Sequence, residues 1–169
     1  MTSIAAPRRS RRVVARLAAA ALLATLTGGV LAASAPAASA DTLAPASAQT
    51  GVDWNGEASF LALINQARAQ VGAAPLALNA DLSNYARNHA WEMAHSQSLR
   101  HSNIAVLLGG WSTVGENVGV GGSVAQVHGA LLASPAHYAN LASGAFTSVG
   151  IGAFVDENGT TWTVHVFAA

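Results

Sequence analysis

The spacing of apolar residues predicts a first amphipathic helix that starts near Glu57. Apolar side chains then recur every three or four positions, at Phe60, Ile64, Ala67 and Val71. Gly72 and Pro75 stop this pattern, because neither residue continues a helix well.

A second helix is expected to begin after Asn79, which is a favourable N-cap residue. Its apolar face carries Leu82, Tyr85 or Ala86, His89 or Ala90, and Met93. The pattern fades over residues 96–98, so the helix should end there.

Residues 109–122 contain six glycines and one short apolar segment, so we expect mostly irregular chain that displays binding groups. Ser123 and Gln126 then form a capping box for a third helix, which bears Val124, Val127 and Leu131. Ser134-Pro135 predicts the start of a short fourth helix, because proline is well tolerated in a first helical turn.

The C-terminal part changes to a period of two, which predicts strands. Val149, Ile151, Ala153 and Val155 alternate with other residues, and Trp162, Val164 and Val166 do so again after the turn signal Asn158-Gly159. Helices followed by an antiparallel hairpin predict an α+β fold, with helices packed on a small antiparallel sheet.

The N-terminal part has the features of an export signal. Five arginines precede an apolar run over residues 17–31, and Ala38-Ser39-Ala40 supplies a cleavage site. We therefore expect a cleaved signal peptide at residues 1–40, a flexible leader at 41–53 and one domain at 54–169. The general secretory and twin-arginine routes both remain open. No membrane span is expected after cleavage.

The mature chain is acidic and contains no cysteine, so no disulfide and no thiolate metal site stabilises it. From Asp41 onward it has three arginines and no lysine against eight carboxylates, a net charge of −5 with neutral histidines. This charge makes nucleic acid a poor partner. We expect a secreted monomer.

One carboxylate stands among four histidines in the middle of the chain. Glu116 is the sole acidic residue between Glu92 and Asp156, a stretch that also holds His95, His101, His128 and His137. Two imidazoles and one carboxylate can hold zinc and leave a position for water. None of the spacings is a local metal signature, however, so ordinary surface or core roles for these residues stay open.

Six motifs in series resemble the bacterial CAP (SCP/PR-1-like) domain. They are Ile64-Asn65-Gln66-Ala67-Arg68, Pro75-Leu76, Leu99-Arg100-His101-Ser102, Gly115-Glu116-Asn117-Val118, Ser134-Pro135-Ala136-His137-Tyr138-Ala139-Asn140 and Val149-Gly150-Ile151-Gly152. The resemblance covers Phe60 to Phe167. It implies a CAP-type α-β-α sandwich, an extracellular or cell-wall location, and a cleft that binds a divalent metal such as zinc in some members.

The resemblance assigns the cleft to His101, Glu116 and His137, together with Ser102, Asn117 and Asn140, and makes the first three the metal ligands. Two departures matter. Residues 117–136 contain no acid, whereas animal and plant members carry a second cleft glutamate there. His165 stands where bacterial members often have a strand glutamine, so it either replaces the missing ligand or lies on the solvent face, and we favour the solvent face.

These observations favour a secreted binding protein whose cleft recognises an extracellular ligand, such as a lipid, a sterol-like molecule or a cell-wall component, with no cofactor required. The first alternative is a metal-dependent hydrolase that uses a zinc-activated water, with Glu116 as ligand or general base. The second is a structural or adhesive protein that uses residues 109–122 as an interaction loop. Binding without catalysis is the preferred hypothesis.

Overall fold

The computed structural model describes residues 50–169. The expected signal peptide and most of the expected leader lie outside the described residues. The elements are β1 (Gly51–Val52), α1 (Trp54–Gln70), β2 (Ala77–Leu78), α2 (Ala80–Ser96), the 3-10 helix η1 (Ile104–Gly109), β3 (Val114–Gly121), α3 (Val124–Ala133), α4 (Pro135–Ala142), β4 (Ser148–Val155) and β5 (Thr161–Ala168). None of these helices is long and apolar enough to cross a bilayer.

The strands form one sheet in the order β1-β4-β5-β3, and all neighbours along this path are antiparallel. The short strand β2 pairs in parallel with the start of β4. It lies along the same edge of β4 as β1, which pairs with the end of that strand. The predicted hairpin is confirmed, because β4 and β5 pair from Ser148↔Ala168 to Val155↔Thr161 around a turn with Gly159 at φ +76°.

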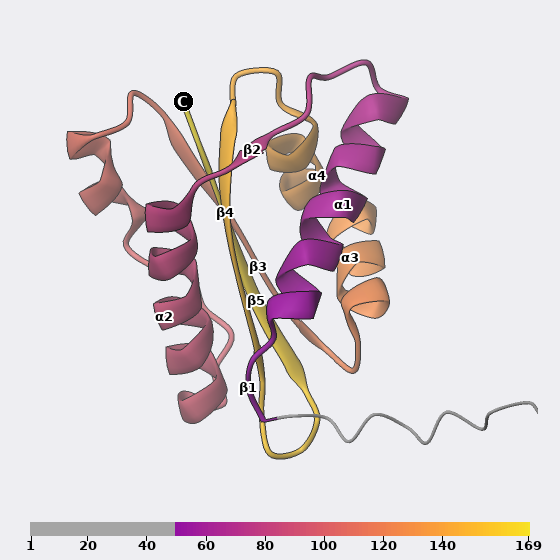
Figure 1. The fold of residues 1–169 in the computed structure, drawn as a ribbon, viewed down its shortest axis with the longest axis vertical. Helices are drawn as coiled ribbons and strands as arrows, with labels where there is room; N and C mark the ends of the chain where they lie inside the picture. The colour runs from indigo at the N-terminus through magenta and orange to yellow at the C-terminus, as the bar shows by residue number, and fades with distance from the viewer. Residues whose placement is uncertain (1–49) are drawn as a thin grey trace, which may run out of the picture. The chain divides into compact units, whose positions relative to one another are not determined.

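Helices cover both faces of the sheet (Figure 1). On one face, α2 packs against side chains of β5 such as Val164 and Val166. On the other face, α1, α3 and α4 enclose a second core around Ile151 and Phe167. This arrangement is the α-β-α sandwich that the resemblance implied.

The predicted helix caps are present. The Asn79 side chain accepts a hydrogen bond from the Leu82 N–H at 3.0 Å, and Ser123 accepts one from Gln126 at 3.2 Å. These oxygens satisfy backbone donors that the first turn of a helix leaves free.

The prediction of irregular chain at residues 109–122 is wrong for most of the segment, because Gly109 ends η1 and residues 114–121 form β3. Its glycines serve close packing in addition to turns. A side chain at position 115 would meet Phe146 at 2.9 Å, and one at position 119 would meet Val127 at 2.5 Å. The glycines remove the alternation by which a strand is recognised, and apolar side chains of α3 and of the segment after α4 fill the space on that face instead.

The boundary of the expected leader also needs correction. Residues 51–53 belong to the fold, because Gly51 and Val52 pair with Val155 and Phe154 of β4. Asp53 caps α1 by accepting a hydrogen bond from the Gly56 N–H at 2.8 Å. The folded domain therefore begins before residue 54.

Arg68 joins α1 to the chain that follows α4. It is 1% exposed and donates to the main-chain oxygens of Leu141 and Ser143 at 2.8 Å, and to that of Ala74 at 2.7 Å. Burial lowers the pKa of this guanidinium, and the carbonyl oxygens compensate part of the lost hydration. Through these contacts Arg68 fixes the C-terminal end of α4, the helix that carries His137 and Asn140.

The backbone of α2 lies directly against β4 at Gly150 and Gly152. A Cβ atom at position 150 would overlap the main chain at Leu82 and Ser83, and one at position 152 would overlap that at Ala86 and Arg87. The two glycines therefore determine how closely α2 approaches the sheet.

We expect Gly152→Ala to lower the free energy of unfolding by about 3 kcal/mol, because the colliding atoms belong to backbone that cannot rotate away. Gly129→Ala is the matched control: position 129 lies in α3 with nothing within 4 Å, so alanine should raise stability by about 0.5–1 kcal/mol. Urea unfolding of both variants measures this. Equal stability of the two variants would contradict the packing described.

Candidate functional site

Glu116 lies on β3 with its side chain 2% exposed, and it accepts three hydrogen bonds. Its Oε1 accepts from His101 Nδ1 at 2.7 Å and from the Ser102 N–H at 2.9 Å, and its Oε2 accepts from the Ser102 hydroxyl. The carboxylate thus holds the loop after α2 against the edge of the sheet. Both of its oxygens are used in doing so.

The His101 ring is held by this contact but remains open to solvent, with 60% of its side chain exposed. Because Nδ1 donates to Glu116, Nε2 is the atom left for a ligand, as an acceptor in the neutral ring. Beside the ring lies a cavity of about 450 Å³. Its walls are Tyr85, Asn88, His89, Glu92, Arg100, His101, Ser102 and Asn103, none of them aliphatic.

Asn117, the next residue on β3, points to the opposite face of the sheet, as alternation along a strand requires. Its amide donates to the main-chain oxygen of His137 at 2.9 Å and accepts from Asn140 at 3.0 Å. Asn140 also donates to the main-chain oxygen of Glu116 at 3.2 Å. These bonds tie α4 to β3 and position His137 at the same end of the sheet as Glu116.

The predicted site residues therefore form two joined networks. His101, Ser102 and Glu116 are in direct contact on one side of β3, and Asn117, Asn140 and the His137 main chain are bonded on the other. The His137 side chain has no recorded hydrogen bond within residues 50–169, and its Nδ1 is buried. Burial, and then the charge of His101, lowers the pKa of His137. Their use as one ligand cleft stays a prediction.

Tyr85 is a site residue that the sequence did not single out. Its hydroxyl donates to the Ser102 oxygen at 3.0 Å, so α2 takes part in positioning the loop that carries His101. The helical pattern allowed either Tyr85 or Ala86 on the buried face. A tyrosine at the margin of a buried face, whose hydroxyl needs a partner, was the available signal.

The solvent-facing position favoured for His165 is wrong: the ring is fully buried in the core between the sheet and α1. It lies edge-on to Phe60, with ring centroids 4.8 Å apart. Neither ring nitrogen has a hydrogen-bond partner within residues 50–169, and the same holds for Nδ1 of His128. Burial first, then the charges of His128 and His137, lowers the pKa of His165 to about 3. The ring is therefore neutral at physiological pH.

The donor set does not match a zinc site with three protein ligands in this arrangement. Both oxygens of Glu116 accept hydrogen bonds. Glu116 therefore orients His101, as a carboxylate does that bonds to a metal-ligating histidine without contacting the metal itself. Across residues 50–169, no group of three or more His, Asp or Glu side chains is arranged to hold a metal ion. Metal binding by His101, Glu116, His137 or His165 stays a prediction, and no chemical step is derived from it.

Comparison with known families agrees with this architecture. A family model described as "CAP: Cysteine-rich secretory protein family" matches residues 61–167. The chain belongs to the CAP family. No curated protein sequence matches the chain significantly.

Solved structures share the CAP fold at low sequence identity. An outer surface protein from Borrelia burgdorferi has a TM-score of 0.64 at 16% identity, over 70% of this chain and 96% of that one. An extracellular protein containing a SCP domain from Bacillus anthracis has a TM-score of 0.59 at 22% identity, over 68% of this chain and 40% of that one. NaASP2, solved with Zn²⁺, has a TM-score of 0.55 at 15% identity, over 69% of this chain and 80% of that one. These likenesses show the fold alone, and the chain spans less than half of the Bacillus protein.

The hydrogen bonds of Glu116 lead to a stability prediction. Glu116→Ala should lower the free energy of unfolding by about 2–3 kcal/mol, because it leaves donors of His101 and Ser102 without their acceptor. Glu116→Gln retains one acceptor oxygen and should cost less. Glu157→Ala, at an exposed carboxylate, should stay within about 0.5 kcal/mol of wild type. Thermal or urea unfolding measures all three, and equal losses for Glu116→Ala and Glu157→Ala would contradict the role of Glu116.

Burial of His165 predicts a loss of stability in mild acid. Its pKa is about 3 in the folded state and close to 6.5 when exposed, so the unfolded chain takes up the proton first as the pH falls. Stability from this residue is complete above pH 6.5 and decreases by up to about 5 kcal/mol between pH 6.5 and 3. His165→Gln should flatten that slope, whereas His95→Gln, at an exposed histidine, should keep it. Parallel unfolding curves measured from about pH 7 to about pH 4 test this, and identical slopes for wild type and His165→Gln would refute it.

Proposed function

We propose that this CAP domain is an extracellular binding protein that presents His101 to a polar ligand, of which a cell-wall component is the best fit. The proposal rests on the hydrogen bonds that Glu116 accepts from His101 and Ser102. Both oxygens of its buried carboxylate accept hydrogen bonds from His101 and Ser102, and this leaves an exposed, oriented imidazole beside a cavity of about 450 Å³. That volume lies within the range usual for ligand sites.

The cavity lining supports a polar ligand over a sterol. Arg100 and Glu92 supply opposite charges, and Asn88 and Asn103 supply amides, whereas no aliphatic side chain forms the wall. Arg100 and Glu92 already pair with each other at 3.5 Å, but a fused hydrocarbon ring system would leave the amides of Asn88 and Asn103 without partners, which costs free energy. Wall fragments carry amide, hydroxyl and carboxylate groups that can pair with them. The descriptions of the Borrelia and Bacillus relatives as outer-surface and extracellular proteins agree with this setting.

A metal-dependent hydrolase has less support. The Ser102 hydroxyl donates a hydrogen bond to Glu116 and accepts one from the Tyr85 hydroxyl. Ser102 is therefore held as a structural contact rather than as a nucleophile. Glu116 is screened from the cavity by the two residues that it binds, which removes it as a general base for a water there. The zinc in the NaASP2 structure remains a reason to test metal binding directly.

Calorimetry with a disaccharide-peptide fragment of peptidoglycan, with cholesterol in detergent and with zinc chloride tests the proposal. We expect wild type to bind the wall fragment, and His101→Ala to weaken that binding about tenfold through loss of one desolvated hydrogen bond to the ligand. Glu157→Gln, outside the cavity, serves as the control and should bind like wild type.

Binding of cholesterol but not of the wall fragment would overturn the choice of ligand. Zinc binding by wild type that is lost in both His101→Ala and His137→Ala would favour the metal site of the alternative. Failure of His101→Ala to change any affinity would remove His101 from the site.

A further inference from the structure

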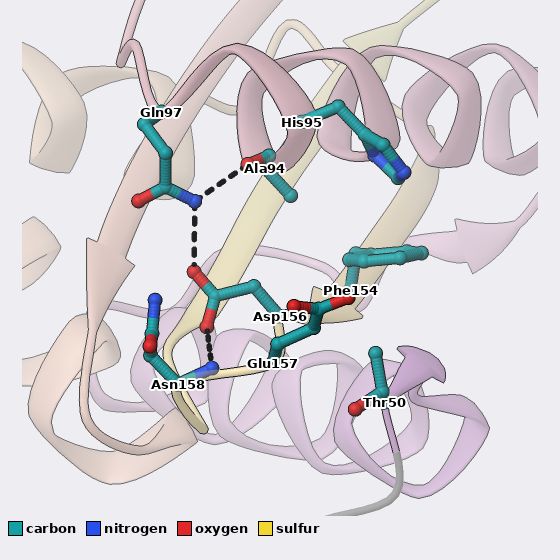
Figure 2. A pocket seen from close by; sticks show the side chains of 8 residues that line it. All are labelled: Thr50, Ala94, His95, Gln97, Phe154, Asp156, Glu157 and Asn158. Carbon is teal, nitrogen blue, oxygen red and sulfur yellow. Dashed lines mark hydrogen bonds between the residues drawn. The ribbon is translucent and has the colours of Figure 1, made fainter.

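A second cavity, of about 400 Å³, lies at the hairpin end of the sheet (Figure 2). Its lining residues are Thr50, Ala94, His95, Gln97, Phe154, Asp156, Glu157 and Asn158. Glu116 pairs with Val166, five residues along β5 from Thr161 at the hairpin, so about 17 Å of strand separates the two sites. The two cavities share no lining residue.

An aromatic wall leads into this cavity from the outer face of α2. The rings of His95 and Phe154 lie 5.6 Å apart between centroids and are tilted by 57°, and the Trp91 ring lies 4.2 Å from that of His95 with a tilt of 37°. Trp91 is 49% exposed, so this group of rings reaches the protein surface. Such rings offer flat apolar area to the C–H face of a ligand at low cost in side-chain entropy.

The floor of the cavity is rigid and already formed. Asp156 accepts hydrogen bonds from Trp162 Nε1 and from the N–H groups of Asn158 and Thr160 at 2.9 Å, and from Gln97 Nε2 at 3.0 Å. These bonds, that of Trp162 foremost, lower the pKa of Asp156 to about 2. The carboxylate is thus charged but has no oxygen in reserve for a ligand, and its effect is to fix the hairpin.

Gln97 ends α2 and lines the cavity. Its φ of 48° is the one left-handed value at a non-glycine residue within 50–169. Its side-chain amide donates to Ala94 O at 2.6 Å and to Asp156, as Figure 2 shows. A left-handed residue is a common helix terminus, so this conformation ends α2 and directs the Gln97 side chain toward Asp156.

Apart from the exposed carboxylate of Glu157, the groups left free in the cavity are neutral hydrogen-bonding groups. His95 donates Nδ1–H to the main-chain oxygen of Trp91 at 2.9 Å, so Nε2 of its neutral ring is an acceptor. The side-chain oxygen of Gln97 and the amide of Asn158 have no recorded hydrogen bond within residues 50–169. No arginine lines the cavity, so an anionic ligand has no charged partner there.

We propose that this cavity binds a pyranose unit of a neutral saccharide. The apolar face of the sugar packs on the rings of His95 and Phe154, and its hydroxyl groups bond to the free amide atoms of Gln97 and Asn158. The combination of aromatic faces with planar amides and the lack of a cationic side chain together select an uncharged, hydroxyl-rich ligand. The site is separate from the His101 cleft and does not depend on the function proposed for it.

Saturation-transfer NMR and calorimetry with chitotetraose, cellotetraose and maltotetraose test the proposal. We expect wild type to bind at least one of them, and His95→Ala to bind it about three- to tenfold more weakly, as the loss of one aromatic contact implies. Trp91→Ala, which removes the ring packed against His95 but no residue of the cavity wall, should weaken binding less. Trp54→Ala is the matched control, because Trp54 is 62% exposed but lies outside the cavity. It should bind like wild type. His95 and Trp91 are both exposed, so their variants should fold, and unfolding curves check this.

Two further variants separate this proposal from its rivals. His101→Ala should keep full saccharide affinity, and a loss there would place the saccharide in the other cleft and overturn the assignment. Glu157→Gln should also bind like wild type, and a loss of more than about tenfold would indicate a cation site instead. Absence of binding to all three oligosaccharides, or equal affinity of wild type and His95→Ala, would overturn the proposal.

Discussion

Coverage of the sheet on both faces is the constraint on which the rest of this structure depends. A polar side chain in a strand with two covered faces has no access to water, so it must find a partner in the protein or remain without one. Glu116 and Asn117, adjacent on β3, show the first outcome. One binds the loop that carries His101, and the other binds α4, so a single edge strand holds both halves of the candidate cleft.

His165 shows the second outcome within the same sheet. It occupies an inward position of β5 with both nitrogens unpaired among the described residues, and the structure accommodates it as a neutral ring packed on Phe60. We therefore expect a core that is stable at neutral pH and loses stability in acid. A charged group at this position would require a counter-ion, and no carboxylate is hydrogen-bonded to His165 or to its neighbour His128 within residues 50–169.

The sequence predicted those elements in which local pattern and capping residues agree. The hairpin of β4 and β5 combines alternation with Asn158-Gly159, and α2 combines a helical face with the Asn79 cap. β3 was missed because glycines at positions 115 and 119 interrupt the alternation, and the side chains that fill their space, Phe146 and Val127, come from elsewhere in the chain.

The same limit applied to the candidate site. Alternation along β5 places His165 on the same face as Thr163 and Phe167. It carries no information on whether a helix covers that face. The contact of His101 with Glu116 spans fifteen positions and has no local spacing signature, so only the series of family motifs indicated it. Tyr85 and the rings around Phe154 acquire a role only when the fold brings distant segments together.

The helix α2 links the two cavities physically. Near its start, Tyr85 supports the loop that carries His101, and near its end, His95 forms a wall of the hairpin cavity. Between them, its backbone rests on Gly152 and has no room to shift toward the sheet. Because the interior is close-packed, we expect a disturbance of this contact to affect both cavities, whereas the side-chain hydrogen bonds between α4 and the sheet join the strand that carries Glu116. The close approach of α2 to β4 is therefore a requirement of both sites as well as of the fold.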